Sequence, residues 1–216
     1  MTKVITLHKR KKPYKNKEKS ERKQNSVFEI EKNRIFLLIL SIIAILIGAI
    51  AYRIFPDTEI ILCIDNSLKL LKTQNFIRIF LYFIQTDLIY IFAAFFIGTS
   101  FIGATLSPLP VILKCIFIGF QSGYLYNEFE LKGVLFCLIL LFPCYIITTS
   151  SLIFACDESI YMSKYLFNTM TNKNTANDIS VKLYLLRYLI LIVINVVCIS
   201  INSAIVYIIA PKINLL

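Results

Sequence analysis

The sequence predicts an all-α integral membrane helical bundle, with about five transmembrane helices and an amphipathic segment at the membrane interface. The first reason is composition, because 57% of the 216 residues are hydrophobic and only 17% are charged. The second is the length of the uncharged runs, the longest of which covers residues 88–113. A helix needs about 20 apolar residues to cross roughly 30 Å of hydrocarbon, and runs of this length have no use in a water-soluble domain.

Most of the positive charge lies in the first 34 residues. This segment holds 12 Lys/Arg and 4 Asp/Glu, so 12 − 4 = +8 of the chain's net +10 belongs to it. We predict that residues 1–34 form a basic, disordered cytoplasmic tail, because so polar a segment cannot bury a core. Cytoplasmic flanks of membrane spans are rich in Lys and Arg, and anionic lipid attracts them. Membrane lipids are therefore the expected partners of the tail, and no nucleic acid is expected.

The first predicted span covers residues 35–55 and reads as a retained signal anchor. Ala44 and Gly48 form a small-xxx-small pair on which a second helix could pack closely, and a plain lipid-facing anchor is the alternative. Residues 57–87 follow with apolar residues at helical spacing and charges on other faces. We predict one or two amphipathic helices at the interface. A short soluble cap on the spans explains the periodicity equally well.

The central stretch predicts two spans, residues 88–106 and 109–126, joined by a tight turn at Ser107–Pro110 where two prolines interrupt the helix. A single broken or re-entrant helix remains open. Gly119 and Gly123 form a GxxxG motif, which is typical of a closely packed helix face. Lys114 is the one charged residue in this stretch. We interpret it as a snorkelling lysine with its ammonium at the headgroups, in preference to a substrate or partner contact.

Two more spans are predicted, at residues 133–156 and 183–210, with a flexible polar loop at 157–182 between them. Pro143 should bend the first of these spans. Asn195 and Asn202 are seven residues apart and should point together into the bundle. Five spans after a basic tail place the N-terminus in the cytoplasm and the C-terminus outside.

No residue pattern indicates catalysis or a metal or cofactor site. The chain has a single histidine, and its six cysteines include no CxxC pair. We interpret the cysteines in the apolar runs as small packing residues. The prediction is therefore no catalytic residues, no cofactor and no metal, and a protein that is not an enzyme.

Residues 80–157 resemble the stage II sporulation protein M family of endospore-forming bacteria. The positions that carry the resemblance are glycines, prolines and one lysine in apolar sequence: Phe101-Ile102-Gly103, Pro108 or Pro110, Lys114, Gly119 and Gly123 with Asn127 closing the helix, Gly133 opening the next span, and Pro143 within it. The family usually has glycine where this chain has Cys115, and often a polar residue where it has Cys144. The lysine-rich tail is also longer than the family's norm.

The resemblance implies a non-enzymatic membrane scaffold. Such a protein recruits the peptidoglycan-degrading stage II sporulation proteins D and P to the septum, where they act during forespore engulfment. The expected location is then the plasma membrane, at the sporulation septum. The alternative is a permease or transporter subunit for a small molecule or lipid. It is supported by the break at Gly103–Pro110 and the predicted bend at Pro143, because interrupted helices often line substrate sites.

Overall fold

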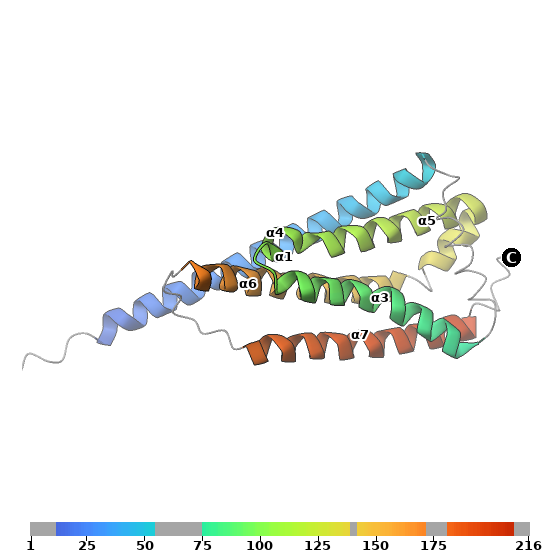
Figure 1. The fold of residues 1–216 in the computed structure, drawn as a ribbon. Helices are drawn as coiled ribbons and strands as arrows, with labels where there is room; N and C mark the ends of the chain where they lie inside the picture. The colour runs from blue at the N-terminus through green and yellow to red at the C-terminus, as the bar shows by residue number, and fades with distance from the viewer. Residues whose placement is uncertain (1–11, 55–74, 139–141, 172–180, 210–216) are drawn as a thin grey trace, which may run out of the picture.

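A computed structural model describes residues 12–54, 75–138, 142–171 and 181–209 (Figure 1). Its regular elements are all α-helices, as the sequence predicts. They are α1 (Lys12–Ile54), α3 (Phe76–Gly98), α4 (Gly103–Leu106), α5 (Pro108–Phe136), α6 (Phe142–Met170) and α7 (Val181–Ile209).

The five long helices alternate in direction. In Figure 1, α1, α5 and α7 run from left to right, and α3 and α6 run from right to left. We call the left end, where α4 connects α3 to α5, the turn end. We call the opposite end, where α5 bends at Glu130, the kink end. Helix α1 packs against α5, and α3 packs against both α6 and α7.

Four described helical segments are long and apolar enough to span a membrane: Glu31–Ile54, Phe76–Gly98, Gly103–Leu135 and Val181–Ile208. Helix α6 is a fifth long helix of the bundle, but Asp157, Glu158 and several hydroxyl residues make it more polar. Many large apolar side chains lie on the outside, including Ile42, Leu46, Phe96, Leu189 and Val197. Such a surface suits lipid, so the predicted all-α membrane bundle is confirmed.

The tail differs from its prediction over the residues that are described. Helix α1 already begins at Lys12, within the tail 1–34 that the sequence predicts to be disordered. Residues 12–34 are rich in Lys and Glu, both of which have good helix propensity, and they continue a helix that the membrane span has already nucleated. Residues 1–11 lie outside the described part of the chain.

The second membrane helix begins and ends earlier than the predicted span 88–106. Helix α3 covers Phe76–Gly98, because Ile79 and Phe83 from the predicted interfacial segment are buried in line with Ile91. The second half of that amphipathic segment is therefore part of the span. Its first half, residues 57–74, lies outside the described residues.

The predicted span 133–156 is divided between two helices. Gly133 belongs to the end of α5, beyond a bend at Glu130, whose φ of 49° is left-handed. Helix α6 starts at Phe142, so Pro143 lies in its first turn and does not bend the middle of a span. A first-turn proline is favourable because its missing N–H would have no helical partner there. Helix α6 then continues to Met170, through part of the predicted loop 157–182, of which residues 172–180 are not described.

Candidate functional site

The bundle interior contains two apolar clusters. The first lies toward the turn end and includes Leu37, Ile91, Val111, Leu152 and Tyr188. The second lies toward the kink end and includes Tyr52, Ile79, Phe83, Phe120 and Ile199. Several buried polar side chains lie between these clusters.

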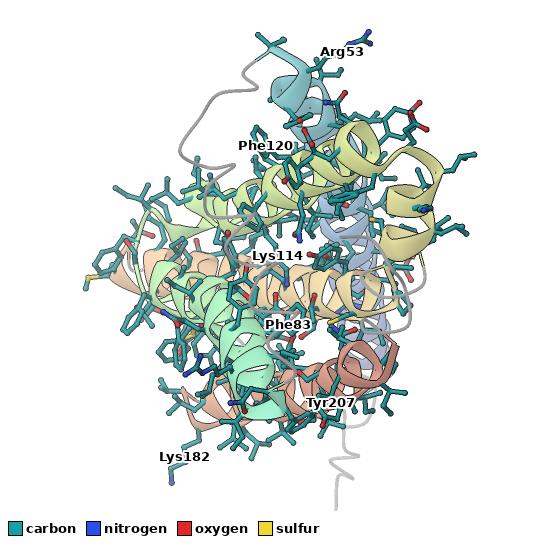
Figure 2. The ribbon with its side chains drawn as sticks, turned by 90° about the vertical axis from the view of Figure 1, so that its right-hand side faces the viewer. Arg53, Phe83, Lys114, Phe120, Lys182 and Tyr207 are labelled. Carbon is teal, nitrogen blue, oxygen red and sulfur yellow. The ribbon has the colours of Figure 1, made fainter. Side chains whose placement is uncertain are left out.

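An ion pair lies between the two clusters. The ammonium nitrogen of Lys114 on α5 is 2.7 Å from a carboxylate oxygen of Asp87 on α3, and the side chains are 5% and 8% exposed. Figure 2 shows Lys114 inside the ring of helices, whereas Arg53 and Lys182 extend from its outside. The interpretation of Lys114 as a snorkelling residue is therefore wrong. The structure provides a buried carboxylate that neutralises the ammonium, so the side chain need not reach the headgroups.

The pair lies near the middle of the predicted membrane thickness. Ile116, two residues after Lys114, contacts Gly48 on α1, and Gly119 contacts Ile45. Helices α1 and α5 run in the same direction, so Lys114 lies beside the centre of the uncharged stretch between Arg34 and Arg53. A charge at that depth is costly in lipid and marks a functional site by default.

Three further polar side chains complete what we call the polar layer: Asp87, Lys114, Thr148, Ser151 and Asn195. Asp87 is flanked along α3 by Phe83 and Ile91, which belong to different clusters. On α7, Asn195 donates a hydrogen bond from its amide nitrogen to the Ser151 hydroxyl of α6. The layer thus draws on four helices.

The polar layer contains unsatisfied atoms. Thr148 Oγ1 and Asn195 Oδ1 are buried without a hydrogen-bond partner, and so is Nδ2 of Asn202, two turns further along α7. Asn195 and Asn202 point into the bundle, as predicted, and are 1% and 4% exposed. Nearby, the Tyr145 hydroxyl donates to Gln121 Oε1 at 2.6 Å, which ties α6 to α5.

A second polar network joins the helices at the turn end. The Ser159 hydroxyl donates to the Ala94 carbonyl at 2.6 Å, and the Tyr188 hydroxyl donates to the Ala155 carbonyl at 2.6 Å. The Ser163 hydroxyl donates to the Ser100 carbonyl and accepts the amide N–H of Ala104. These bonds hold α3, α4, α6 and α7 together at the connection between α3 and α5.

Two ion pairs lie at the level of this network. Arg34 Nε is 2.8 Å from Asp157, and its guanidinium group covers the Phe154 ring. Arg187 binds both carboxylate oxygens of Glu158 at 2.6 and 2.7 Å. Charged pairs on three helices at one level indicate that the hydrocarbon region ends there.

The glycines singled out from the sequence lie at close helix contacts. A Cβ on Gly119 would collide with the Ile45 carbonyl of α1, and one on Gly48 with the Ile116 carbonyl of α5. A Cβ on Gly123 would lie 3.2 Å from the Ala49 carbonyl oxygen. The two small-residue motifs predicted separately therefore face each other across one interface. No side chain separates the two backbones there, which is the geometry of GxxxG packing.

The other glycines and prolines on which the family resemblance rests lie at or near the connections between helices. Gly103 opens α4, where a Cβ would collide with the Ile97 carbonyl and approach Ser163 Oγ to 3.1 Å. Pro110 lies in the first turn of α5, so the chain does not turn at Ser107–Pro110 as predicted: α3 already ends at Gly98, and the connection to α5 lies before the prolines. Gly133 packs back against Leu125 after the bend. Cys115 and Cys144, where the family differs, are both buried, as expected of packing cysteines.

Asp87 was not predicted to belong to the site, because the segment 57–87 that contains it is predicted to lie at the membrane interface. Its helical spacing from Phe83 and Ile91 was the available signal: all three fall on one face of a helix that starts at Phe76. Within the described ranges, no three His, Cys, Asp or Glu side chains gather as a metal site would require. The side chains of the polar layer can form a charge pair and hydrogen bonds.

The residues on which the family resemblance rests therefore lie at helix contacts and at helix ends, except Lys114, which lies in the polar layer. Searches against protein-family models, curated proteins and solved structures find no match to this chain.

Proposed function

We propose that this protein is a non-enzymatic membrane scaffold that resembles the stage II sporulation protein M family. It recruits the peptidoglycan-degrading stage II sporulation proteins D and P to the septum of the plasma membrane during forespore engulfment. The N-terminus is cytoplasmic, so the kink end faces the side where the wall lies.

One observation carries the proposal: the small residues that prompted the resemblance lie at contacts that fix the helices relative to one another. Gly119 and Gly123 bring α5 against α1, and Gly103 brings α4 against the end of α3. A scaffold needs a rigid framework that presents its ends to partners, and close backbone packing supplies one. The kink end carries Asn127, Glu128 and Glu130 on the segment that we assign to partner binding.

Affinity capture from sporulating cells tests the proposal. The tagged protein should retain stage II sporulation proteins D and P, and a strain lacking it should form the polar septum and then stop before engulfment. A variant with Glu128→Ala and Lys132→Ala should lose capture while keeping its abundance, since both residues are outside the packed interior. A matched change at the turn end, Lys182→Ala, should retain capture. Normal engulfment in the deletion strain would contradict the proposal.

The second candidate is a permease or transporter subunit for a small molecule or lipid. The observation that favours it is the polar layer, because ionisable residues within membrane helices often mark substrate or ion pathways. Transport predicts that Lys114→Met abolishes solute uptake when uptake is measured per amount of folded protein. A scaffold predicts that any loss of capture in Lys114→Met follows the loss of folded protein.

A further inference from the structure

We infer that the polar layer is an internal water-binding site, lined by Asp87, Lys114, Thr148 and Asn195 and extended toward the kink end by Asn202. This inference is independent of whether the protein acts as a scaffold or as a permease. It concerns what occupies the middle of the bundle.

The first observation is the set of unpaired atoms. Thr148 Oγ1, Asn195 Oδ1 and Asn202 Nδ2 are buried and have no partner in the protein. A buried polar atom without a partner costs about 1–3 kcal/mol, and native structures leave few of them unpaired. The asparagine oxygen needs a donor, the asparagine nitrogen needs an acceptor, and the hydroxyl can be either. Water can satisfy all three, because it both donates and accepts.

The second observation is that these atoms follow one line. Asn195 bonds Ser151 across α6 and α7, and Thr148 lies one turn from Ser151 on the same inner face. Asn202 is two turns further along α7, about 10 Å toward the kink end. Cys144 lies one turn before Thr148. Thr148 itself lies on α6 between Tyr145 of the second cluster and Leu152 of the first, just as Asp87 lies on α3 between Phe83 and Ile91. The unpaired atoms of Thr148 and Asn195 therefore lie in the layer of the ion pair, between the two apolar clusters, and Asn202 lies further toward the kink end.

The ion pair explains why water, and not a cation, is the expected occupant. Lys114 already neutralises Asp87 at 2.7 Å, so an added alkali ion would leave a net positive charge in the middle of the membrane. Water adds no charge and accepts the ammonium donors that the carboxylate leaves free. It also lowers the desolvation cost that opposes burying two charges. Sites of this kind hold waters with two to four polar partners each.

Thermal unfolding of the purified protein in detergent tests the inference, because a dry and a hydrated interior predict Tm changes of opposite sign for Thr148→Val. In a dry interior, Thr148→Val removes an unsatisfied hydroxyl and raises Tm. In a hydrated interior, the same change removes a bond to water and lowers Tm by a few degrees. The matched control is Thr86→Val, whose hydroxyl bonds its own helix carbonyls at 3.0 Å, so its loss reports only the effect of removing a threonine hydroxyl. We expect Thr148→Val to lower Tm more than Thr86→Val does. An equal or higher Tm would contradict the inference.

Radiolytic hydroxyl-radical footprinting gives a second, direct readout with two native cysteines. Cys144 lies beside the proposed water and Cys156 in the apolar cluster at the turn end, and both are buried. Radicals formed from bound water oxidise adjacent side chains, so Cys144 should be oxidised several-fold faster than Cys156. Asn202→Leu should reduce the difference. Equal rates would overturn the assignment, and so would a wild-type Tm that rises with sodium but not with choline, since that would indicate a cation.

Discussion

The ammonium nitrogen of Lys114 lies 2.7 Å from a carboxylate oxygen of Asp87, and this contact ties α5 to α3 in the interior of the bundle. The two helices are consecutive membrane passes joined through α4, so the pair fixes their relative position along the membrane normal. Each residue alone would be an uncompensated charge in hydrocarbon. The pair is thus a strong determinant of which helix faces meet.

Removing one member of the pair should destabilise the protein strongly. Asp87→Asn leaves Lys114 buried without a counter-charge, and breaking a buried pair in this way costs about 3–5 kcal/mol. We expect lower abundance in the membrane and a lower Tm in detergent. The double variant Asp87→Asn with Lys114→Met should recover part of the loss, because no charge remains unpaired. If Asp87→Asn alone melts like the wild type, the pair does not hold the bundle together.

A larger side chain in place of an interface glycine should push helices α1 and α5 apart. Gly119→Leu places a side chain where even a Cβ would collide with the Ile45 carbonyl, and Gly48→Leu does the same from the α1 side. Both variants should insert into the membrane, because leucine is more apolar than glycine, but both should have a lower Tm than the wild type. Gly123→Ala is the matched control, since its Cβ would lie 3.2 Å from the nearest atom and needs only a small shift. Equal Tm values for Gly119→Leu and Gly123→Ala would show that the interface is not close-packed.

Loss of the turn-end hydroxyls should weaken the contact between α3, α6 and α7. Ser159→Ala removes the donor to the Ala94 carbonyl, and Tyr188→Phe removes the donor to the Ala155 carbonyl. Each should cost about 1 kcal/mol, and the double variant should cost less than the sum because the two hydroxyl oxygens are in contact, so the two sites are coupled. Unfolding in detergent measures these values. Ser150→Ala, whose exposed hydroxyl bonds only within its own helix, should be close to neutral.

Orientation in the membrane should follow the basic tail. In a cysteine-free background, a cysteine introduced at Glu128 should react with an impermeant thiol reagent from outside, and one introduced at Lys182 only after the membrane is opened. The structure places these positions at opposite ends of the bundle. Reaction of the Glu128 cysteine only from the cytoplasmic side would reverse the proposed orientation.

The sequence identified the class of fold, because long uncharged runs have few other uses. It also identified both small-residue motifs of the interface between α1 and α5. Their pairing could not be predicted, since neither motif specifies which helix faces it. The contact of Gly48 with Ile116 and of Gly119 with Ile45 is a tertiary result.

The polar layer shows where local reasoning fails. Lys114 looked like a single charge in a lipid-facing helix because Asp87, 27 residues earlier, was assigned to a different environment. The error came from the start of the span: an uncharged run begins after Asp87, whereas the helix begins at Phe76. A charge in a span costs less when a partner helix supplies its counter-charge, so uncharged runs underestimate helix length. Pro143 was misplaced for a related reason, because proline fits both a mid-span bend and a first turn.

The most direct test of the scaffold proposal is reconstitution with a purified wall hydrolase. The protein is placed in liposomes, mixed with stage II sporulation proteins D and P, and sedimented before peptidoglycan is added. We predict that wall-degrading activity sediments with liposomes that contain this protein, stays in solution with empty liposomes, and is absent when the hydrolases are omitted. Release of soluble peptidoglycan fragments by the protein alone, or equal sedimentation with empty liposomes, would contradict the account.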